Sequence, residues 1–148
     1  MKGFVKTFTV AALIALSSVA MAAEKPVSKS ERISINLSTA ELALQHYVAV
    51  TTAGASFGLE QLFAQDFSQK IHTSTIHTYG RRAVIECLNK QQGEILNCKT
   101  HIKTVEKSAD YMIAKIVLKF DSFSMTDLVT LVYENGIWQV SKSIHSYQ

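Results

Sequence analysis

MTDLVTLVYENGIWQVSK, residues 125–142, contains two alternating apolar runs that flank Asn135-Gly136. An Asn-Gly pair between such runs favours a two-residue hairpin loop, because both residues tolerate the positive φ that the turn requires. The sequence therefore predicts antiparallel strands over residues 125–133 and 137–145, joined by a tight turn.

A two-residue loop also fixes which residues lie opposite one another. It pairs Tyr133 with Trp138, and if the ladder continues without a break it pairs Val129 with Lys142. One face of the hairpin is then strongly apolar and is expected to lie under helices. That face carries Val129, Leu131, Tyr133, Trp138, Val140 and Ile144.

Two charged residues, Asp127 and Lys142, fall on this apolar face as diagonal neighbours across the strands. A carboxylate and an ammonium that converge on an apolar sheet face are typical of a pocket floor. The alternative is an ion pair at the rim of the sheet, with both side chains reaching water. The pattern leaves both interpretations open.

Upstream of the hairpin, residues 111–120 alternate clearly and residues 99–106 alternate weakly, so both are predicted strands. The face of the clearer strand carries Met112, Ala114, Ile116, Leu118 and Phe120. Helical spacing predicts helices over residues 57–70 and 81–91, and residues 71–79 could hold one short strand.

A further helix is predicted over residues 38–53. Ser38 and Glu41 have the spacing of a capping box, and Gly54 is placed to end the helix. Three helices followed by antiparallel strands indicate an α+β domain.

The first residues have the order of a secretory signal peptide. Lys2 and Lys6 precede an apolar run, and Ala20-Met21-Ala22 forms a small-x-small cleavage site. The run is too short to span a bilayer. We expect a signal peptide over residues 1–22, a flexible leader over 23–37 and one domain over 38–148. The protein is expected in the periplasm or outside the cell, with no membrane partner after cleavage.

The composition excludes several classes of protein. The chain has 148 residues, 47% of them hydrophobic and 18% charged, and a net charge of +3. These values fit one globular domain rather than a disordered or acidic tail. Without the predicted signal peptide, 13 basic groups face 12 acidic ones. No nucleic-acid partner is expected from a nearly neutral domain without a Lys/Arg run.

Cys87 and Cys98 are the only cysteines. An oxidising compartment would permit a disulfide between them, and the alternative is two separate buried thiols. His72 and His77 have an odd separation, which places them on opposite faces of one strand. With no other ligand spacing and no Gly-rich phosphate loop, neither a metal nor a cofactor is expected.

Two stretches resemble the nuclear transport factor 2-like superfamily, which includes ketosteroid isomerase and the SnoaL-like polyketide cyclases. The first is YVAVTTAG over residues 47–54, followed by LFA over 62–64. The second is the hairpin itself, which is similar to the closing hairpin of the bacterial lumazine-binding branch. The resemblance implies a cone-shaped fold in which helices pack on the concave face of a strongly curved antiparallel sheet around a cavity. It also implies a homodimer through the outer sheet face.

The resemblance gives some residues possible roles. Tyr47 matches the isomerase tyrosine that donates to a developing oxyanion, although a packing role is the alternative. The stretch that should supply the isomerase base, residues 68–72, contains no carboxylate. His72 could substitute for the base, or it could be a surface histidine. His46 could point into the cavity, or it could be a hydrogen-bonded interior histidine.

Three functions follow from these observations. The first is an exported, non-catalytic domain that binds an apolar small molecule, with the site formed by Tyr47, Asp127, Trp138, Lys142 and His46. The second is an isomerase- or cyclase-type enzyme in which Tyr47 donates a hydrogen bond and Asp127 or His72 acts as acid or base. The third is an interaction domain that uses the outer sheet face, where Ile113 and Val117 alternate with Lys115 and Lys119.

Overall fold

The computed structural model describes residues 34–148, so the predicted signal peptide and most of the predicted leader lie outside the described residues. The packed domain begins earlier than expected. Leu37 is 4% exposed, and its carbonyl accepts a hydrogen bond from the backbone N–H of Trp138. No helix in the described part of the chain is long and apolar enough to cross a membrane.

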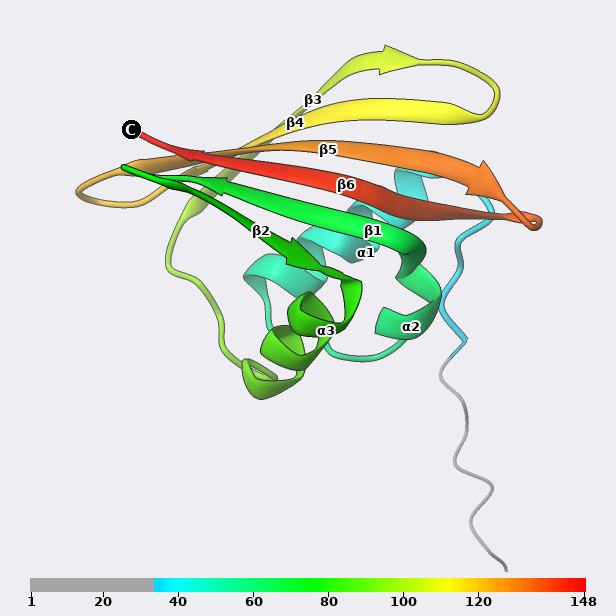
Figure 1. The fold of residues 1–148 in the computed structure, drawn as a ribbon, viewed down its shortest axis with the longest axis horizontal. Coiled ribbons are helices and arrows are strands. Elements are labelled where there is room, and N and C mark those ends of the chain that lie inside the picture. The colour runs from blue at the N-terminus through cyan, green and yellow to red at the C-terminus, as the bar shows by residue number, and fades with distance from the viewer. Residues whose placement is uncertain (1–33) are drawn as a thin grey trace, which may run out of the picture. The chain divides into compact units, whose positions relative to one another are not determined.

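The domain is a six-stranded curved sheet with all its helices on one side (Figure 1). The strand order is β2-β1-β6-β5-β4-β3, and every neighbouring pair is antiparallel except β1 and β6, which are parallel. The predicted α+β class is confirmed. The elements are α1 (Ala40–Thr52), α2 (Leu59–Leu62), β1 (Phe63–His72), β2 (Ile76–Gly80), α3 (Arg81–Lys90), β3 (Lys99–Lys107), β4 (Tyr111–Lys119), β5 (Ser124–Glu134) and β6 (Ile137–Tyr147).

The start of α1 differs by one residue from the predicted capping box. Thr39 is the N-cap, and its hydroxyl accepts a hydrogen bond from the N–H of Leu42. Ser38 lies one residue before the cap, and its N–H and hydroxyl both donate to the Asn36 side chain. The Glu41 carboxylate is bound by Lys107 of β3. The helix ends as predicted, with Gly54 in the left-handed conformation at φ 66°.

The predicted helix over residues 57–70 is wrong for most of its length. A single turn, α2, is followed directly by the long strand β1. Phe63 and Phe67 have helical spacing, but positions four apart also share one face of a strand, and both side chains are buried on the inward face. The strand β1 pairs with β6 on one side and with β2 on the other. This tertiary pairing outweighs the helical spacing of the apolar residues.

The closing hairpin forms in the predicted register for its first pairs and then shifts. Tyr133 lies opposite Trp138 and Leu131 opposite Val140, but Thr130 lies opposite Lys142. Ser141 is the extra residue of a β-bulge, and its hydroxyl donates to the Thr130 carbonyl at 3.3 Å.

The bulge reverses the faces of the rest of β6. Ser143 is fully buried opposite Val129, whereas Lys142 is exposed on the other side. The prediction that Lys142 and Ile144 share the apolar face with Asp127 is therefore wrong, because one inserted residue exchanges the two faces of a strand.

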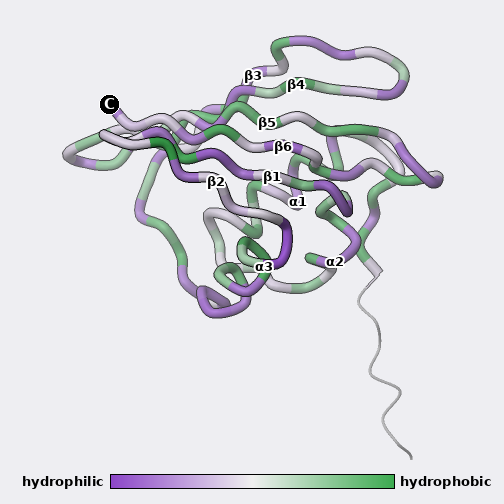
Figure 2. Tube along the Cα trace, in the orientation of Figure 1, coloured by the Kyte–Doolittle hydropathy of each residue, from purple (hydrophilic) through white to green (hydrophobic). Residues whose placement is uncertain are grey.

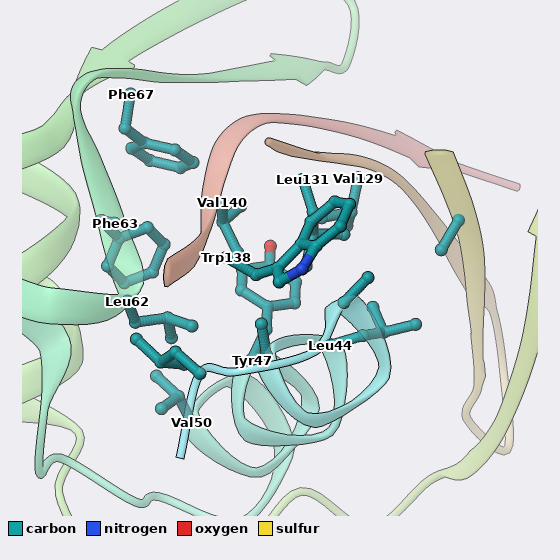
Figure 3. Packing of buried hydrophobic residues seen from close by; sticks show 14 of the residues in the cluster. Leu44, Tyr47, Val50, Leu62, Phe63, Phe67, Val129, Leu131, Trp138 and Val140 are labelled. Carbon is teal, nitrogen blue, oxygen red and sulfur yellow. The ribbon is translucent and has the colours of Figure 1, made fainter. Parts of the chain in front are cut away.

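The core lies between the helices and the inward face of the sheet. Hydrophobic and hydrophilic positions alternate along β4, β5 and β6 (Figure 2). Side chains from α1, from the α2–β1 corner and from the hairpin meet there (Figure 3). The largest fully buried side chains of the core are Tyr47, Leu62, Phe63, Met112, Leu118 and Leu131.

Gly54 should be intolerant of any side chain. A Cβ at this position would lie 2.5 Å from the backbone nitrogen of Glu94 and 2.6 Å from that of Gly93. Gly93 also has positive φ, 80°, but a Cβ there would meet open space. We expect Gly93→Ala to lower the free energy of unfolding by about 1–2 kcal/mol, the left-handed conformational cost alone. Gly54→Ala should cost about 3 kcal/mol or more, because rigid backbone must also move.

Urea unfolding of both variants measures the difference. Equal destabilisation by Gly54→Ala and Gly93→Ala would contradict the close approach of residues 93–94 to the end of α1.

Candidate functional site: an apolar cavity above a buried carboxylate

A cavity of about 600 Å³ lies between α3, the end of α1 and one end of the sheet. Its walls are mainly apolar. Val84 and Leu88 come from α3, and Leu118 comes from β4. The β4–β5 turn and the end of β6 add an aromatic side, in which Phe120 and Phe123 stack at 4.5 Å and Tyr147 lies beside them. The polar side chains on the wall include Thr51, Gln69, Glu94 and His145.

A buried carboxylate lies next to this cavity. Asp127 of β5 is 3% exposed, and Tyr47 and Ser143 both donate to it. The Tyr47 hydroxyl is 2.6 Å from Asp127 Oδ2, and the Ser143 hydroxyl is 2.8 Å from Oδ1. Figure 3 shows Tyr47 rising from α1 with its hydroxyl toward the sheet. These bonds compensate the loss of hydration that burial of the carboxylate entails.

His145 connects the carboxylate to the cavity. It lies directly opposite Asp127 in the β5–β6 ladder, and its Nε2 is 3.2 Å from Asp127 Oδ2. The side chain of Gln69 is 3.3 Å from the same nitrogen. His145 and Gln69 line the cavity, whereas Asp127 lies behind them. If Nε2 carries the proton and donates to Asp127, Nδ1 is the ring's acceptor nitrogen.

The environment of Tyr47 keeps its hydroxyl protonated. Burial raises the pKa of Tyr47 well above 10, and the neighbouring Asp127 carboxylate raises it further. Burial, followed by the charge of Asp127, also raises the pKa of Tyr147. A hydroxyl has one proton to donate, and that of Tyr47 goes to Asp127. Tyr47 therefore acts as a fixed donor to the carboxylate.

The structure brings together only two of the residues predicted to form a site, Tyr47 and Asp127, and they bind each other. Trp138 is 7% exposed within the core, beside Tyr133. Lys142 is exposed on the opposite face of the sheet. None of these four residues lines the cavity.

The two histidines singled out from the sequence lie elsewhere. His46 binds the Phe57 carbonyl through Nε2 at 2.9 Å, which agrees with the alternative of a hydrogen-bonded histidine. His72 is exposed at the end of β1, opposite Ile76. Neither is among the residues that line the cavity.

Sequence reasoning missed His145, Gln69 and Ser143. His145 and Ser143 were assigned to the wrong face because the bulge at Ser141 was not anticipated. Gln69 was assigned to a helix that is in fact β1. The charge of Asp127 was a sequence signal for such residues, because a carboxylate on an apolar face requires polar partners nearby.

Both cysteines are free thiols. Cys87 is exposed on α3 and lines the cavity, whereas Cys98 packs partly buried against the core. The possible disulfide is thus not formed, and the alternative of two buried thiols is also wrong for Cys87, which is exposed. Within residues 34–148, no three His, Cys, Asp or Glu side chains are grouped as a metal site would require.

The raised pKa of Tyr47 predicts a specific loss of stability in alkali. Its folded-state pKa lies above the ordinary value of 10, so its contribution to stability is complete below pH 10 and declines as the pH rises further. The expected slope from this one group is about 1.4 kcal/mol per pH unit. Tyr47→Phe removes that component and, at neutral pH, costs about 1–3 kcal/mol because Asp127 loses a donor.

Urea unfolding of wild type and Tyr47→Phe between neutral pH and pH 11 measures both effects. The other tyrosines contribute equally to the two proteins and cancel in the difference. An unfolding free-energy difference that stays constant across this range would contradict a buried, protonated Tyr47.

Comparison with known proteins agrees with this architecture. An NTF2-like protein of unknown function from Silicibacter pomeroyi matches with a TM-score of 0.61 and 17% identity, over 73% of this chain and 92% of that one. An NTF2-like protein from Shewanella baltica matches with a TM-score of 0.59 and 14% identity, over 72% and 88%. A cystatin-like fold from Caulobacter vibrioides gives a TM-score of 0.54 and 13% identity, over 73% and 86%.

These identities are low, so the similarity extends to the fold alone. A search of curated proteins finds no match. The model of one sequence family, described as "Putative lumazine-binding", matches residues 36–146, which is most of the chain and nearly all of the described domain. The chain therefore belongs to the family described as "Putative lumazine-binding", and its fold is that of the NTF2-like proteins.

Proposed function

We propose that this protein is an exported binding domain that holds a small, largely apolar molecule in the cavity beside α3. The observation that carries the proposal is the cavity itself. Its volume of about 600 Å³ lies within the range typical of small-molecule sites. An apolar wall with a few convergent polar groups is also typical of such sites, and here His145 and Gln69 supply those groups.

The aromatic side of the cavity favours a flat ligand. Phe120 and Phe123 are nearly parallel, at an interplanar angle of 12°, and Tyr147 is within 6.3 Å of Phe123. A planar ring system packs well against such surfaces. The family description names lumazine, a planar heterocycle, which makes lumazine a suitable first probe.

Export is the part of the proposal that rests on residues 1–22 alone. The basic start, apolar run and Ala20-Met21-Ala22 site support it. Intact mass of the protein from its own cells would support export by showing a chain that begins at Ala23.

A second candidate function is acid–base catalysis, and the Asp127–His145 pair favours it. A carboxylate that accepts from a histidine holds the ring in one tautomer and one orientation. His145 could then remove a proton from a carbon acid bound in the cavity. This differs from the enzyme predicted from sequence, because Tyr47 is already bound to Asp127 and His72 is remote from the cavity. Deuterium uptake from heavy water into a bound ligand, absent in His145→Gln, would support catalysis.

Blocking the cavity should abolish binding. Ala83 lines the cavity from α3, while its neighbour Arg82 does not and is almost fully exposed. We expect Ala83→Trp to lose the ligand because the indole would fill the opening. Arg82→Trp adds the same side chain to the same helix turn outside the cavity and should retain the ligand.

Native mass spectrometry of the three proteins, purified from the source organism, tests this prediction and identifies the ligand by its mass. The proposal predicts an added mass on wild type and on Arg82→Trp only. An equal added mass on Ala83→Trp, or none on wild type with added lumazine also failing to bind, would count against it.

A further inference from the structure

All the helices of the domain lie on one side of the sheet and leave its outer face uncovered by them (Figure 1). This outer face is strongly basic. The strand register shows which side chains share it. Lys103 lies opposite Lys115 and Lys99 opposite Lys119, and all four are exposed. The complete set of exposed lysines on this outer basic face is Lys70, Lys99, Lys103, Lys115, Lys119 and Lys142.

Little negative charge balances these lysines. The acidic residues at outward paired positions of β3 to β6 are Glu106 and Glu134, both toward the Asn135-Gly136 end, and β1 adds one exposed carboxylate, Asp66. Glu106 already accepts a hydrogen bond from the Tyr111 hydroxyl. Within residues 34–148, none of the six lysines forms an ion pair. The near-neutral charge expected for the mature chain thus conceals a separation of charge onto one face.

The arrangement does not favour folding. Like charges directly opposite one another on neighbouring strands destabilise the pairing. Two such pairs, Lys99 with Lys119 and Lys103 with Lys115, lie on β3 and β4, with the His101–Val117 pair between them. A negatively charged partner would turn this local repulsion into a favourable interaction.

The side chains that lie between the lysines indicate which kind of partner the face would bind. The positions that link Lys115 to Lys70 across the sheet are Leu128 and Ile144. The adjacent row holds Val117, Thr126 and Ser146, with a histidine at each end, His101 on β3 and His72 on β1. Between these two imidazoles the side chains are aliphatic or carry hydroxyls, so the middle of the face offers no stacking platform for nucleic-acid bases. The arginines of the described chain, which would suit bidentate phosphate recognition, both lie on α3.

We propose that the outer basic face docks this domain onto an anionic phospholipid bilayer. Lysines act as point charges toward a negative surface, and a face that spans several strands presents them together rather than in a groove. The partly exposed Leu128 and Ile144 lie among these lysines, where the surface would meet the lipid headgroups. Two copies joined through this face would instead bring their lysines together, so the charge opposes the homodimer expected from the family resemblance.

Binding of the full-length chain to vesicles tests the proposal. The probe is phosphatidylcholine with about a third phosphatidylglycerol, compared with phosphatidylcholine alone. Lys103→Gln/Lys115→Gln should weaken binding to the anionic vesicles about thirtyfold, since each lysine near the surface contributes about fivefold. The matched control Arg82→Gln/Lys90→Gln removes the same charge from α3 and should bind like wild type. All proteins share the same N-terminus, so the difference reports on the face.

The salt dependence and stability of the variants provide two further readouts. Binding should be lost near 1 M salt, where charges are screened beyond about 3 Å. Lys103→Gln/Lys115→Gln should melt no lower than wild type, since it relieves repulsion.

Several outcomes would overturn the proposal. These are equal binding to neutral and anionic vesicles, an equal loss in the α3 control, and binding to duplex or single-stranded oligonucleotides but not to vesicles. A stable dimer in which cross-linking places Lys103 and Lys115 at the interface would also overturn it.

Discussion

A carboxylate buried between α1 and the sheet is the constraint on which the candidate site depends. Asp127 would be strongly unfavourable in this position without partners. Its partners come from two elements, with Tyr47 on α1 and both Ser143 and His145 on β6. The interaction therefore fixes α1 against the hairpin and sets the side of β6 that faces the cavity. It also holds the His145 side chain at the cavity wall, because its Nε2 contacts the Asp127 carboxylate.

One extra residue in β6 makes this cluster possible. Without the bulge at Ser141, Lys142 would enter the core beside Val129, and His145 would face outward. The hairpin turn and the pairs nearest to it could be predicted, because Asn135-Gly136 and the alternation act over a few residues. The bulge could not, because its position depends on which side chains the rest of the fold can accommodate. The two charges that the simple register placed on the apolar face, Asp127 and Lys142, were the local signs that it failed.

Other elements show the same division between local and tertiary information. The strand β4 and the helix α3 follow patterns complete within themselves, and they were predicted nearly to the residue. The strand β1 was predicted as helix because Phe63 and Phe67 share helical spacing, while its parallel partner β6 is distant in the chain. The net charge was a poor guide to the surface for a related reason, because a total cannot show that six lysines gather on one face.

The proposals of export, ligand binding and membrane docking rest on separate parts of the molecule. These parts are residues 1–22, the cavity beside α3 and the outer basic face.

The central claim is that Tyr47 and Asp127 are coupled and hold the helix to the sheet. A double-mutant cycle on the free energy of unfolding, with Tyr47→Phe, Asp127→Asn and both together, measures that coupling most directly. The account predicts a coupling energy of about 1–3 kcal/mol, since each single change leaves the other group without its partner. Changes that add to within about 0.5 kcal/mol would contradict it, because independent groups behave in that way.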